Sequence, residues 1–215
     1  MIVTIDGPAG AGKSTAAKGL AQRLGFRFLD TGAMYRAVAL AGLRQGVDWE
    51  DADALGRLAR DLKIQVEGRR VLLDGEDVSD AIRSFEITSL TRYPAANPQV
   101  RQRLVELQRQ AAAGQDVVTE GRDQGTVVFP GAECKIFLTA DSVKRAQRRY
   151  RDLQDRGDNV PFDEVLARQN QRDQQDTRRD CGPLVPAADA IELATDGLTS
   201  QQVVDRLEAL VRSRM

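Results

Sequence analysis

Short apolar runs alternate with stretches of helical periodicity along most of this 215-residue chain. The apolar runs have the length and composition of buried strands, and they lie at residues 2–5, 26–29, 117–119, 135–138 and 191–194. Between them, apolar positions recur every three or four residues, as in 17–24, where Gly25 supplies a stop signal. Strands that alternate with helices predict an α/β fold, with a parallel sheet of about five strands flanked by helices.

One region interrupts this alternation. A short amphipathic helix is followed by three short apolar runs, separated by Gly68 and by the pair Asp74-Gly75. Turn residues between such runs predict a small antiparallel β meander. Pro94 and Pro98 then predict a break before the next helix. We therefore expect an insertion between the second and third strands of the sheet rather than a separate domain.

The composition of the chain excludes several kinds of catalytic and metal-binding site. The chain has no histidine, which excludes Ser-His-Asp and Cys-His catalysis and histidine-ligated zinc. Cys134 and Cys181 are too few for a disulfide framework or a CxxC metal site. A formal net charge of −1 argues against general nucleic-acid binding. No apolar run reaches the ~18 residues of a membrane span, and no charged-then-apolar leader precedes the first strand. We therefore expect a cytoplasmic protein that binds neither nucleic acid nor membrane.

A glycine-rich loop joins the first strand to the first helix. Residues 7–14 read G-P-A-G-A-G-K-S, a full G-x-x-x-x-G-K-[ST] motif in its strand–loop–helix context. Small residues let the backbone wrap around a phosphate, and the amides at the helix start point inward. Lys13 would reach the β- and γ-phosphates of ATP, and the Ser14 hydroxyl would bind Mg²⁺. The predicted ATP-binding residues are Gly7, Pro8, Ala9, Gly10, Ala11, Gly12, Lys13, Ser14 and Thr15.

Arginines are concentrated in the second half of the chain. Residues 144–179 contain ten basic and seven acidic side chains. Such a run is often a solvated helix face with ion pairs. However, Arg172, Asp176 and Arg179 share one helix face at i, i+4, i+7 spacing, and the break at 157–161 predicts a mobile flap between two helices. Phosphoryl transfer needs several cations around the transferring group and a lid that excludes water, so this region is a candidate lid.

Two further loops leave strands at the carboxyl edge of the predicted sheet, where ligands of open α/β sheets bind. Thr31 and Arg36 follow the second strand, and Glu120 and Asp123 follow the third. Glu120 or Asp123 could hold a water ligand of Mg²⁺, the role of an acidic residue that ends a neighbouring strand. Thr31 is also expected to cap the helix that it begins, and Asp123 could equally be a turn residue.

Six phrases of the sequence together resemble the bacterial cytidylate kinase family of nucleoside monophosphate kinases. They are IDGPAGAGKST, FLDTGAMYR, EGRDQGTVVFP, KIFLTA, RDQQDTRRDCGPL and PAADAIEL. The resemblance, which runs nearly end to end, implies transfer of the ATP γ-phosphoryl group to CMP or dCMP with Mg²⁺ and a closing lid. It also implies a single domain over 1–215, whose parts are a core of 1–30, 114–150 and 180–215, an acceptor-binding region of 31–113 and a lid of 151–179.

The resemblance assigns roles to residues that pattern alone leaves open. For the acceptor nucleotide, it implies Thr31, Arg36 and Arg122 near the phosphate, Arg101 and Asp123 at the cytosine edge, Arg172 and Asp176 near the sugar, and Arg179 as a further contact. We take as catalytic candidates the cations Lys13, Arg148, Arg149 and Arg172. Which of the lid arginines contacts the transferred phosphoryl group stays open.

The chain departs from the family's pattern at three positions. Arg92 stands where the family usually has a serine near the cytosine, so either a local shift brings in the adjacent Thr91 or the base is read differently. Gln124 replaces the usual methionine of GRDMGT, a change that we expect to affect packing only. Gln175 stands where some relatives carry another lid arginine and others do not.

Two other functions remain open from the residues alone. One is a P-loop kinase of another small acceptor, such as UMP or AMP. The other is a nucleotide-gated binding module that hydrolyses ATP slowly, although such a module has no need of a second set of phosphate-binding arginines. We expect a monomer whose partners are ATP and CMP or dCMP.

Overall fold

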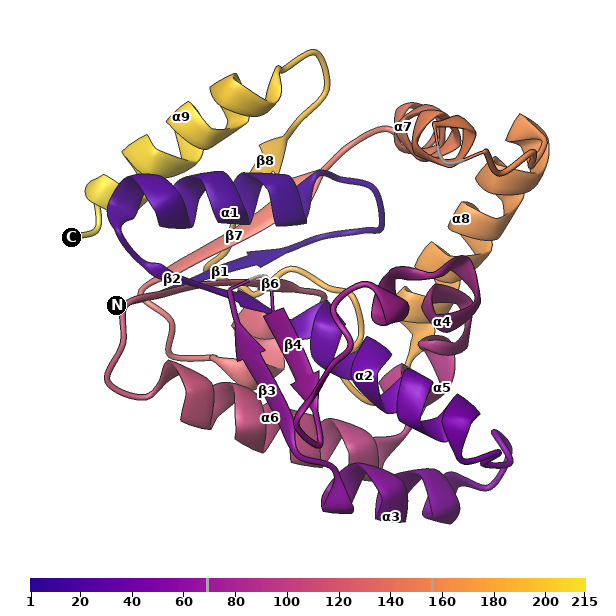
Figure 1. The fold of residues 1–215 in the computed structure, drawn as a ribbon. Helices are drawn as coiled ribbons and strands as arrows, with labels where there is room; N and C mark the ends of the chain where they lie inside the picture. Colours follow the sequence, from indigo (N-terminus) through magenta and orange to yellow (C-terminus); the bar gives the residue numbers. More distant parts are fainter. Residues whose placement is uncertain (69, 156) are drawn as a thin grey trace. The chain divides into compact units, whose positions relative to one another are not determined.

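Five strands form the main sheet of the protein, in a computed structural model that describes residues 1–68, 70–155 and 157–215. Their order is β2-β6-β1-β7-β8 (Figure 1). Strand β1 pairs in parallel with β6 and with β7, and β8 pairs in parallel with β7. The prediction of a parallel sheet is therefore confirmed. The strands are β1 (Ile2–Asp6), β2 (Arg27–Asp30), β6 (Val117–Gly121), β7 (Cys134–Thr139) and β8 (Ile191–Ala194).

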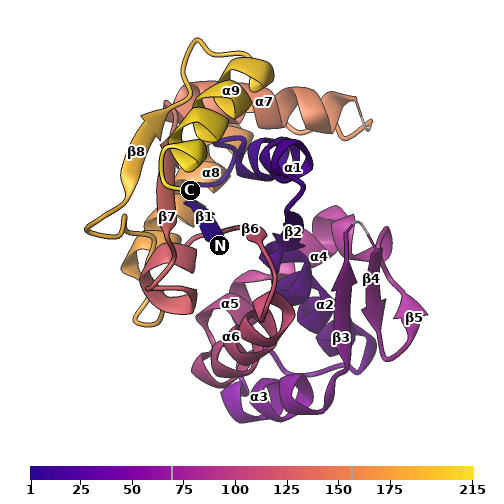
Figure 2. The same ribbon diagram turned by 90° about the vertical axis from the view of Figure 1, so that its left-hand side faces the viewer.

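The chain divides into two compact units, and the first comprises Met1–Phe28 and Asp116–Met215. Helices α1 (Lys13–Leu24) and α9 (Ser200–Arg212) lie side by side on one face of its sheet (Figures 1 and 2). Their apolar sides and the strands β1, β6 and β7 form the main core. Because this core holds the carboxyl end of β1 and the first turn of α1 together, it fixes the loop between them.

A helical hairpin in the same unit has a small core of its own. It consists of α7 (Ser142–Gln154) and α8 (Phe162–Arg178), on either side of the predicted break. Ala146, Leu153 and Val165 are buried between the two helices, and the rings of Tyr150 and Phe162 meet edge to face with centroids 5.9 Å apart. These contacts let α7 and α8 act as one structural element.

The second unit, Leu29–Gln115, is built around helix α2 (Thr31–Arg44). Three short strands form a separate sheet in the order β3-β4-β5 within the described residues, and its antiparallel pairing confirms the predicted meander (Figure 2). No helix in the described part of the chain is long and apolar enough to cross a membrane. The remaining elements of this unit are α3 (Ala52–Asp61), β3 (Ile64–Glu67), β4 (Arg70–Leu73), β5 (Glu76–Asp77), η1 (Ala81–Arg83), α4 (Phe85–Leu90), α5 (Arg92–Ala96) and α6 (Pro98–Ala112).

Two local features differ from expectation. The cap of α2 is Asp30, whose carboxylate accepts a hydrogen bond from the amide of Ala33 at 3.0 Å, so the expectation that Thr31 caps this helix is wrong. The break predicted between Pro94 and Pro98 is confirmed at Asn97, which is extended between α5 and α6; Pro94 itself lies in the first turn of α5, where proline costs no intrahelical hydrogen bond. The π-helix η2 (Gln124–Val128) was not expected, since such turns have no local sequence pattern.

Candidate active site

The loop between β1 and α1 is held close to the neighbouring strand β7. Gly7 has φ 148°, and a Cβ atom added there would lie 2.2 Å from the carbonyl oxygen of Leu138. No side chain can therefore replace glycine at this point without moving the backbone. Gly12, with φ 87°, is the N-cap residue of α1 and offers no capping side chain. A helix N-terminus of this kind is suited to bind an anion such as a phosphate group.

Lys13 is buried at the start of α1 and turns back into its own loop. Only 5% of the residue is exposed, and its ammonium group donates a hydrogen bond to the carbonyl of Pro8 at 2.8 Å. Burial, together with the positive charges of Arg122 and Arg172, lowers the pKa of Lys13 to about 7 against the opposing effect of Glu120 and Asp6. An anionic phosphate placed here would restore the charged form of the lysine.

Ser14 and Glu120 bring two oxygen ligands together at the edge of the sheet. The Ser14 hydroxyl donates to the Glu120 carboxylate at 2.9 Å, and Glu120 lies near the end of β6 with 7% of the residue exposed. Mg²⁺ prefers oxygen ligands and is usually held by one or two protein groups together with substrate phosphates. This hydroxyl–carboxylate pair beside the glycine-rich loop therefore fits a magnesium ion.

Asp6, which the sequence analysis did not single out, anchors the segment that follows β6. Its buried carboxylate accepts hydrogen bonds from the backbone amides of Gln124 at 2.9 Å and Gly125 at 2.8 Å. Burial raises the pKa of Asp6 to about 6, although the two amides and Lys13 favour the ionised form. An acidic residue that ends a buried apolar strand is a signal that could have identified it. Asp6 thus fixes the backbone directly after Asp123, which is itself buried.

An ion-pair cluster surrounds Asp176 on helix α8, whereas Arg179, predicted on the same helix face, is the extended C-cap residue just beyond the helix. Asp176 accepts a hydrogen bond from the Nε of Arg122 at 2.8 Å and lies 3.4 Å from a guanidinium nitrogen of Arg179. Burial acts to raise the pKa of Asp176, but the charges of Arg122, Arg179 and Arg172 outweigh it and lower the pKa. Arg172 is exposed on α8. In this unit the structure thus brings together Lys13, Arg122, Arg172, Asp176 and Arg179, whereas Arg148 and Arg149 lie half-buried on α7.

The second unit holds the remaining predicted residues. Arg36 on α2 pairs with Asp30 at 3.3 Å, and its buried Nε has no hydrogen-bond partner among the described residues. Thr31, the first residue of the same helix, is 2% exposed. Arg101 is buried on α6 and donates to the hydroxyl of Tyr35 at 3.3 Å. Asp30 thus caps α2 and also orients Arg36, which lies further along the same helix.

Arg92 and Thr91 occupy different environments. The guanidinium of Arg92 lies over the ring of Tyr93, 4.7 Å from its centroid, and donates to the Tyr93 hydroxyl at 2.9 Å. Thr91 is buried, and its hydroxyl donates to the carbonyl of Ile87 at 2.8 Å. One interpretation of this position was a local shift that brings Thr91 to the base. Such a shift would have to break this intrahelical hydrogen bond.

The first strand of a parallel sheet runs through a glycine-rich loop into a helix. A buried lysine lies in that loop, and a hydroxyl–carboxylate pair lies beside it. These features define a P-loop nucleotide-binding protein. The family model "Cytidylate kinase" matches residues 3–213. The chain belongs to the cytidylate kinase family, and it is therefore a kinase.

Similar proteins agree with this assignment. The chain is 50% identical to a cytidylate kinase of Rhodopirellula baltica, over 99% of this chain and 93% of that protein. It is 51% identical to a cytidylate kinase of Pelotomaculum thermopropionicum, over 97% of this chain and 95% of that protein. Among solved structures, an uncharacterized protein from Eubacterium ventriosum shares the fold, with a TM-score of 0.54 and 14% identity over 100% of this chain and 99% of that one.

Proposed function

We propose that this protein transfers the γ-phosphoryl group of ATP to CMP and dCMP, producing CDP and dCDP. The observation that carries the proposal is the group of cations, Lys13, Arg122 and Arg172, beside the glycine-rich loop of a chain that belongs to the cytidylate kinase family. Phosphoryl transfer depends on such a group, because negative charge spreads over the transferred phosphoryl oxygens in the transition state.

In this proposal ATP is bound through its phosphates. The amides of residues 7–15 surround the β- and γ-phosphates, and Lys13 exchanges its hydrogen bond with the Pro8 carbonyl for contacts with phosphate oxygens. The ion that accompanies ATP is Mg²⁺, which the Ser14 hydroxyl and the Glu120 carboxylate would hold, Glu120 directly or through a water. When bound, Mg²⁺ neutralises part of the charge on the β- and γ-phosphates.

The acceptor nucleotide is bound by the residues that the family resemblance assigns to it. Arg36 and Arg122 bind its phosphate together with the Thr31 hydroxyl, and Arg101 and Asp123 read the cytosine edge. Asp6 supports Asp123 through the amides of the next two residues. The sugar and the rest of the nucleotide are bound from helix α8, by Arg172, Asp176 and Arg179.

The absence of histidine from the chain is consistent with this chemistry. The attacking group is a phosphate oxygen of the acceptor, which is already anionic at neutral pH, so the reaction requires no general base. Catalysis is then the in-line alignment of two phosphates and the neutralisation of charge by Lys13, Mg²⁺ and the arginines, including Arg148, Arg149 and Arg172. Closure of a lid formed by 151–179 excludes water and prevents hydrolysis of ATP.

The proposal divides the single domain as the resemblance implies: a core of 1–30, 114–150 and 180–215, an acceptor-binding region of 31–113 and the lid. We further propose that the protein acts as a monomer in the cytoplasm. The alternative of a nucleotide-gated binding module is disfavoured by family membership, which leaves UMP or AMP as the competing acceptors.

The test is direct detection of the products. Purified protein is incubated with ATP, Mg²⁺ and CMP, and the nucleotides are separated by ion-exchange chromatography. We expect CDP and ADP to appear in equal amounts. Release of ADP and inorganic phosphate without CDP would indicate a slow ATPase and overturn the proposal.

A further inference from the structure

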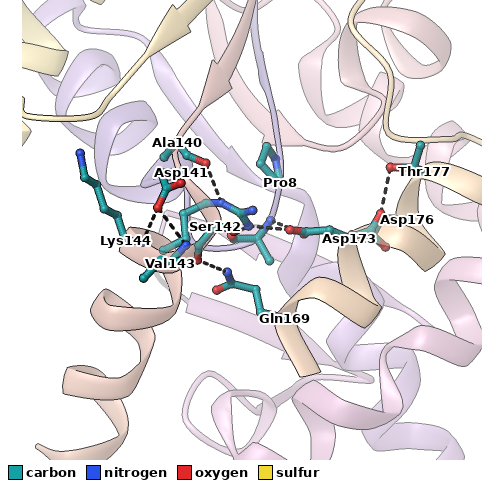
Figure 3. Close-up of polar contacts among 12 residues, drawn as sticks. Pro8, Ala140, Asp141, Ser142, Val143, Lys144, Gln169, Asp173, Asp176 and Thr177 are labelled. Carbon is teal, nitrogen blue, oxygen red and sulfur yellow. Dashed lines mark hydrogen bonds and ion pairs between the residues drawn. The ribbon is translucent and has the colours of Figure 1, made fainter. Parts of the chain in front are cut away.

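The backbone N–H and C=O groups of one residue in the glycine-rich loop, Ala9, are both bound by an ion pair between α7 and α8. Arg145 on α7 donates to the carbonyl of Ala9 at 2.7 Å and to the carboxylate of Asp173 on α8 at 2.6 Å. The other carboxylate oxygen of Asp173 accepts a hydrogen bond from the amide of Ala9 at 3.3 Å. Figure 3 shows Asp173 reaching from α8 toward the loop at Pro8. The pair therefore binds both the donor and the acceptor group of one residue.

The contact is closely packed as well as polar. Arg145 is 6% exposed, and its Nε also donates to the carbonyl of Ala140 at 2.9 Å. The Gln169 side chain donates to the Ser142 carbonyl at 3.0 Å, which attaches α8 to the start of α7 (Figure 3). A Cβ atom added to Gly10, which has φ 78°, would lie 3.2 Å from the Cβ of Arg145 and 3.4 Å from the Gln169 side-chain oxygen. Space at the loop's tip is thus limited by both helices.

Helix α8 has a second anchor one turn further along. Asp176 lies three residues after Asp173, so the two carboxylates project from neighbouring positions on the same side of the helix. Asp173 is bound to the glycine-rich loop, and Asp176 is bound to Arg122 at the end of β6. Two anchors one turn apart fix both the position of α8 along its axis and its rotation.

We propose that Arg145 and Asp173 are positioning residues for phosphoryl transfer, which fix helix α8, and with it Arg172, relative to the loop that binds the ATP phosphates. Arg172 is adjacent to Asp173, so any rotation or sliding of α8 at this anchor displaces its guanidinium directly. The inference rests on the proposed function, because its consequence is measured on the transfer step.

Asp173 hydrogen-bonds the backbone of the loop and pairs with Arg145. Its loss shifts α8, and with it Arg172 and Asp176, whereas acceptor residues on other elements, such as Arg36 and Arg101, keep their own contacts. A displacement of about 1 Å in a reacting group can reduce the rate by about a hundredfold. The effect is therefore expected to be larger in kcat than in the KM for CMP.

The first experiment measures kcat and both KM values for Asp173→Asn, which keeps the shape of the side chain and removes its charge. We expect kcat to fall at least about tenfold and by a larger factor than the KM for CMP rises, with partial recovery in Asp173→Glu. The control is Glu164→Gln, which removes an exposed ion pair with Arg168 on the same helix and should leave kcat unchanged. An unchanged kcat in Asp173→Asn, or an equal loss in Glu164→Gln, would overturn the proposal.

A double-mutant cycle tests whether the two residues act together. We expect Arg145→Ala, Asp173→Ala and the double variant to lose kcat by similar factors, because breaking either contact already releases α8. Losses that multiply in the double variant would show two independent contributions and contradict the paired role.

Amide hydrogen exchange provides a readout that needs no turnover. In free wild-type protein the amide of Ala9 should exchange more slowly than in Asp173→Ala, which removes the acceptor, whereas Glu164→Gln should match wild type. Equal exchange of Ala9 in all three proteins would overturn the contact itself. Failure of the proposed function would instead appear as the absence of CDP with the wild-type protein, while the exchange difference persisted.

Discussion

The ammonium group of Lys13 and the carbonyl of Pro8 are joined by a hydrogen bond of 2.8 Å within a single loop. The lysine is almost fully buried, and this carbonyl is a neutral partner. Its charge is therefore stabilised less than it would be by a carboxylate or a phosphate, and the lowered pKa of Lys13 follows mainly from its burial. The loop thus holds a cation in a position where a bound phosphate would stabilise it.

Replacing this lysine should abolish turnover. For Lys13→Ala we expect kcat to fall by at least about a hundredfold, because the variant loses a strong electrostatic donor to the transition state. Lys18→Ala is a matched control: it removes a lysine of the same helix that lies over the ring of Phe28. Steady-state kinetics, with circular dichroism to confirm folding, would check both variants. A near-normal kcat for Lys13→Ala would contradict the assignment of the loop.

The pKa of Lys13 predicts how stability depends on pH. Burial lowers this pKa from its usual 10.5 to about 7 in the folded protein, so between these values the unfolded chain binds more protons than the folded one. The free energy of unfolding therefore rises with pH in this window, and the cost of the buried charge is fully present below pH 7.

Lys13→Met, which keeps most of the volume, removes that cost. We expect the variant to have a higher Tm than wild type at pH 6 and a smaller advantage at pH 9.5, as measured by thermal unfolding without nucleotide. An advantage that is constant across this range, or that grows with pH, would show that Lys13 does not titrate as inferred.

Asp123 should set the choice of base. Cytosine offers an exocyclic amine and an N3 acceptor, and Asp123 can accept from the amine while Arg101 donates to N3. A site built from buried polar groups rejects a base that leaves them unpaired. Asp123→Ala should therefore reduce the ratio of kcat/KM for CMP over UMP about tenfold or more, with the KM for ATP much less affected. Competition assays with both acceptors would measure it, and an unchanged ratio would remove Asp123 from base reading.

Arg92 should contribute little to the base choice in spite of its place in the family's pattern. Its guanidinium packs over Tyr93 and bonds the Tyr93 hydroxyl, so it is already engaged. We expect Arg92→Ser to change kcat/KM for CMP and for UMP by similar factors. A selective gain or loss with UMP would instead indicate that Arg92 contacts the base, through O4 of uracil for example.

Ligand binding should protect the hairpin of α7 and α8. Arg148, Arg149 and Arg172 gain phosphate partners only when both nucleotides are bound, so we expect amide exchange in these helices to slow most with an ATP analogue and CMP together. Each nucleotide alone provides the comparison. Equal protection in free and doubly liganded protein would argue against a lid.

The local parts of this fold could be predicted from sequence because their causes are local. The strand at residues 2–5, the glycine-rich loop and the Gly25 stop depend on neighbours within about ten residues, and the i, i+4 spacing of Arg172 and Asp176 places both on one side of α8. Arg179 was predicted on the same face, but the helix ends at Arg178 and Arg179 is extended. The roles of these side chains remain predictions.

The contacts that organise the site could not be predicted in this way. Asp6 bonds amides 118 and 119 residues away, and Asp173 bonds an amide 164 residues away. Such pairs form because the sheet brings the ends of β1 and β6 together, and no spacing in the sequence encodes them. For the same reason the sequence places Arg145 only among the basic residues before the break at 157–161, whereas in the structure it donates to the carbonyl of Ala9.

A screen of acceptors with the wild-type protein tests the central claim most directly. ADP release is followed in a coupled assay with ATP, Mg²⁺ and each of CMP, dCMP, UMP and AMP, and kcat/KM is determined for each. The account predicts efficient turnover of CMP and dCMP, with UMP and AMP lower by well over tenfold. Uracil offers neither an amine for Asp123 nor an acceptor for Arg101, and adenine carries both groups on a larger, two-ring base. A kcat/KM for UMP within about threefold of that for CMP, or a preference for AMP, would contradict it.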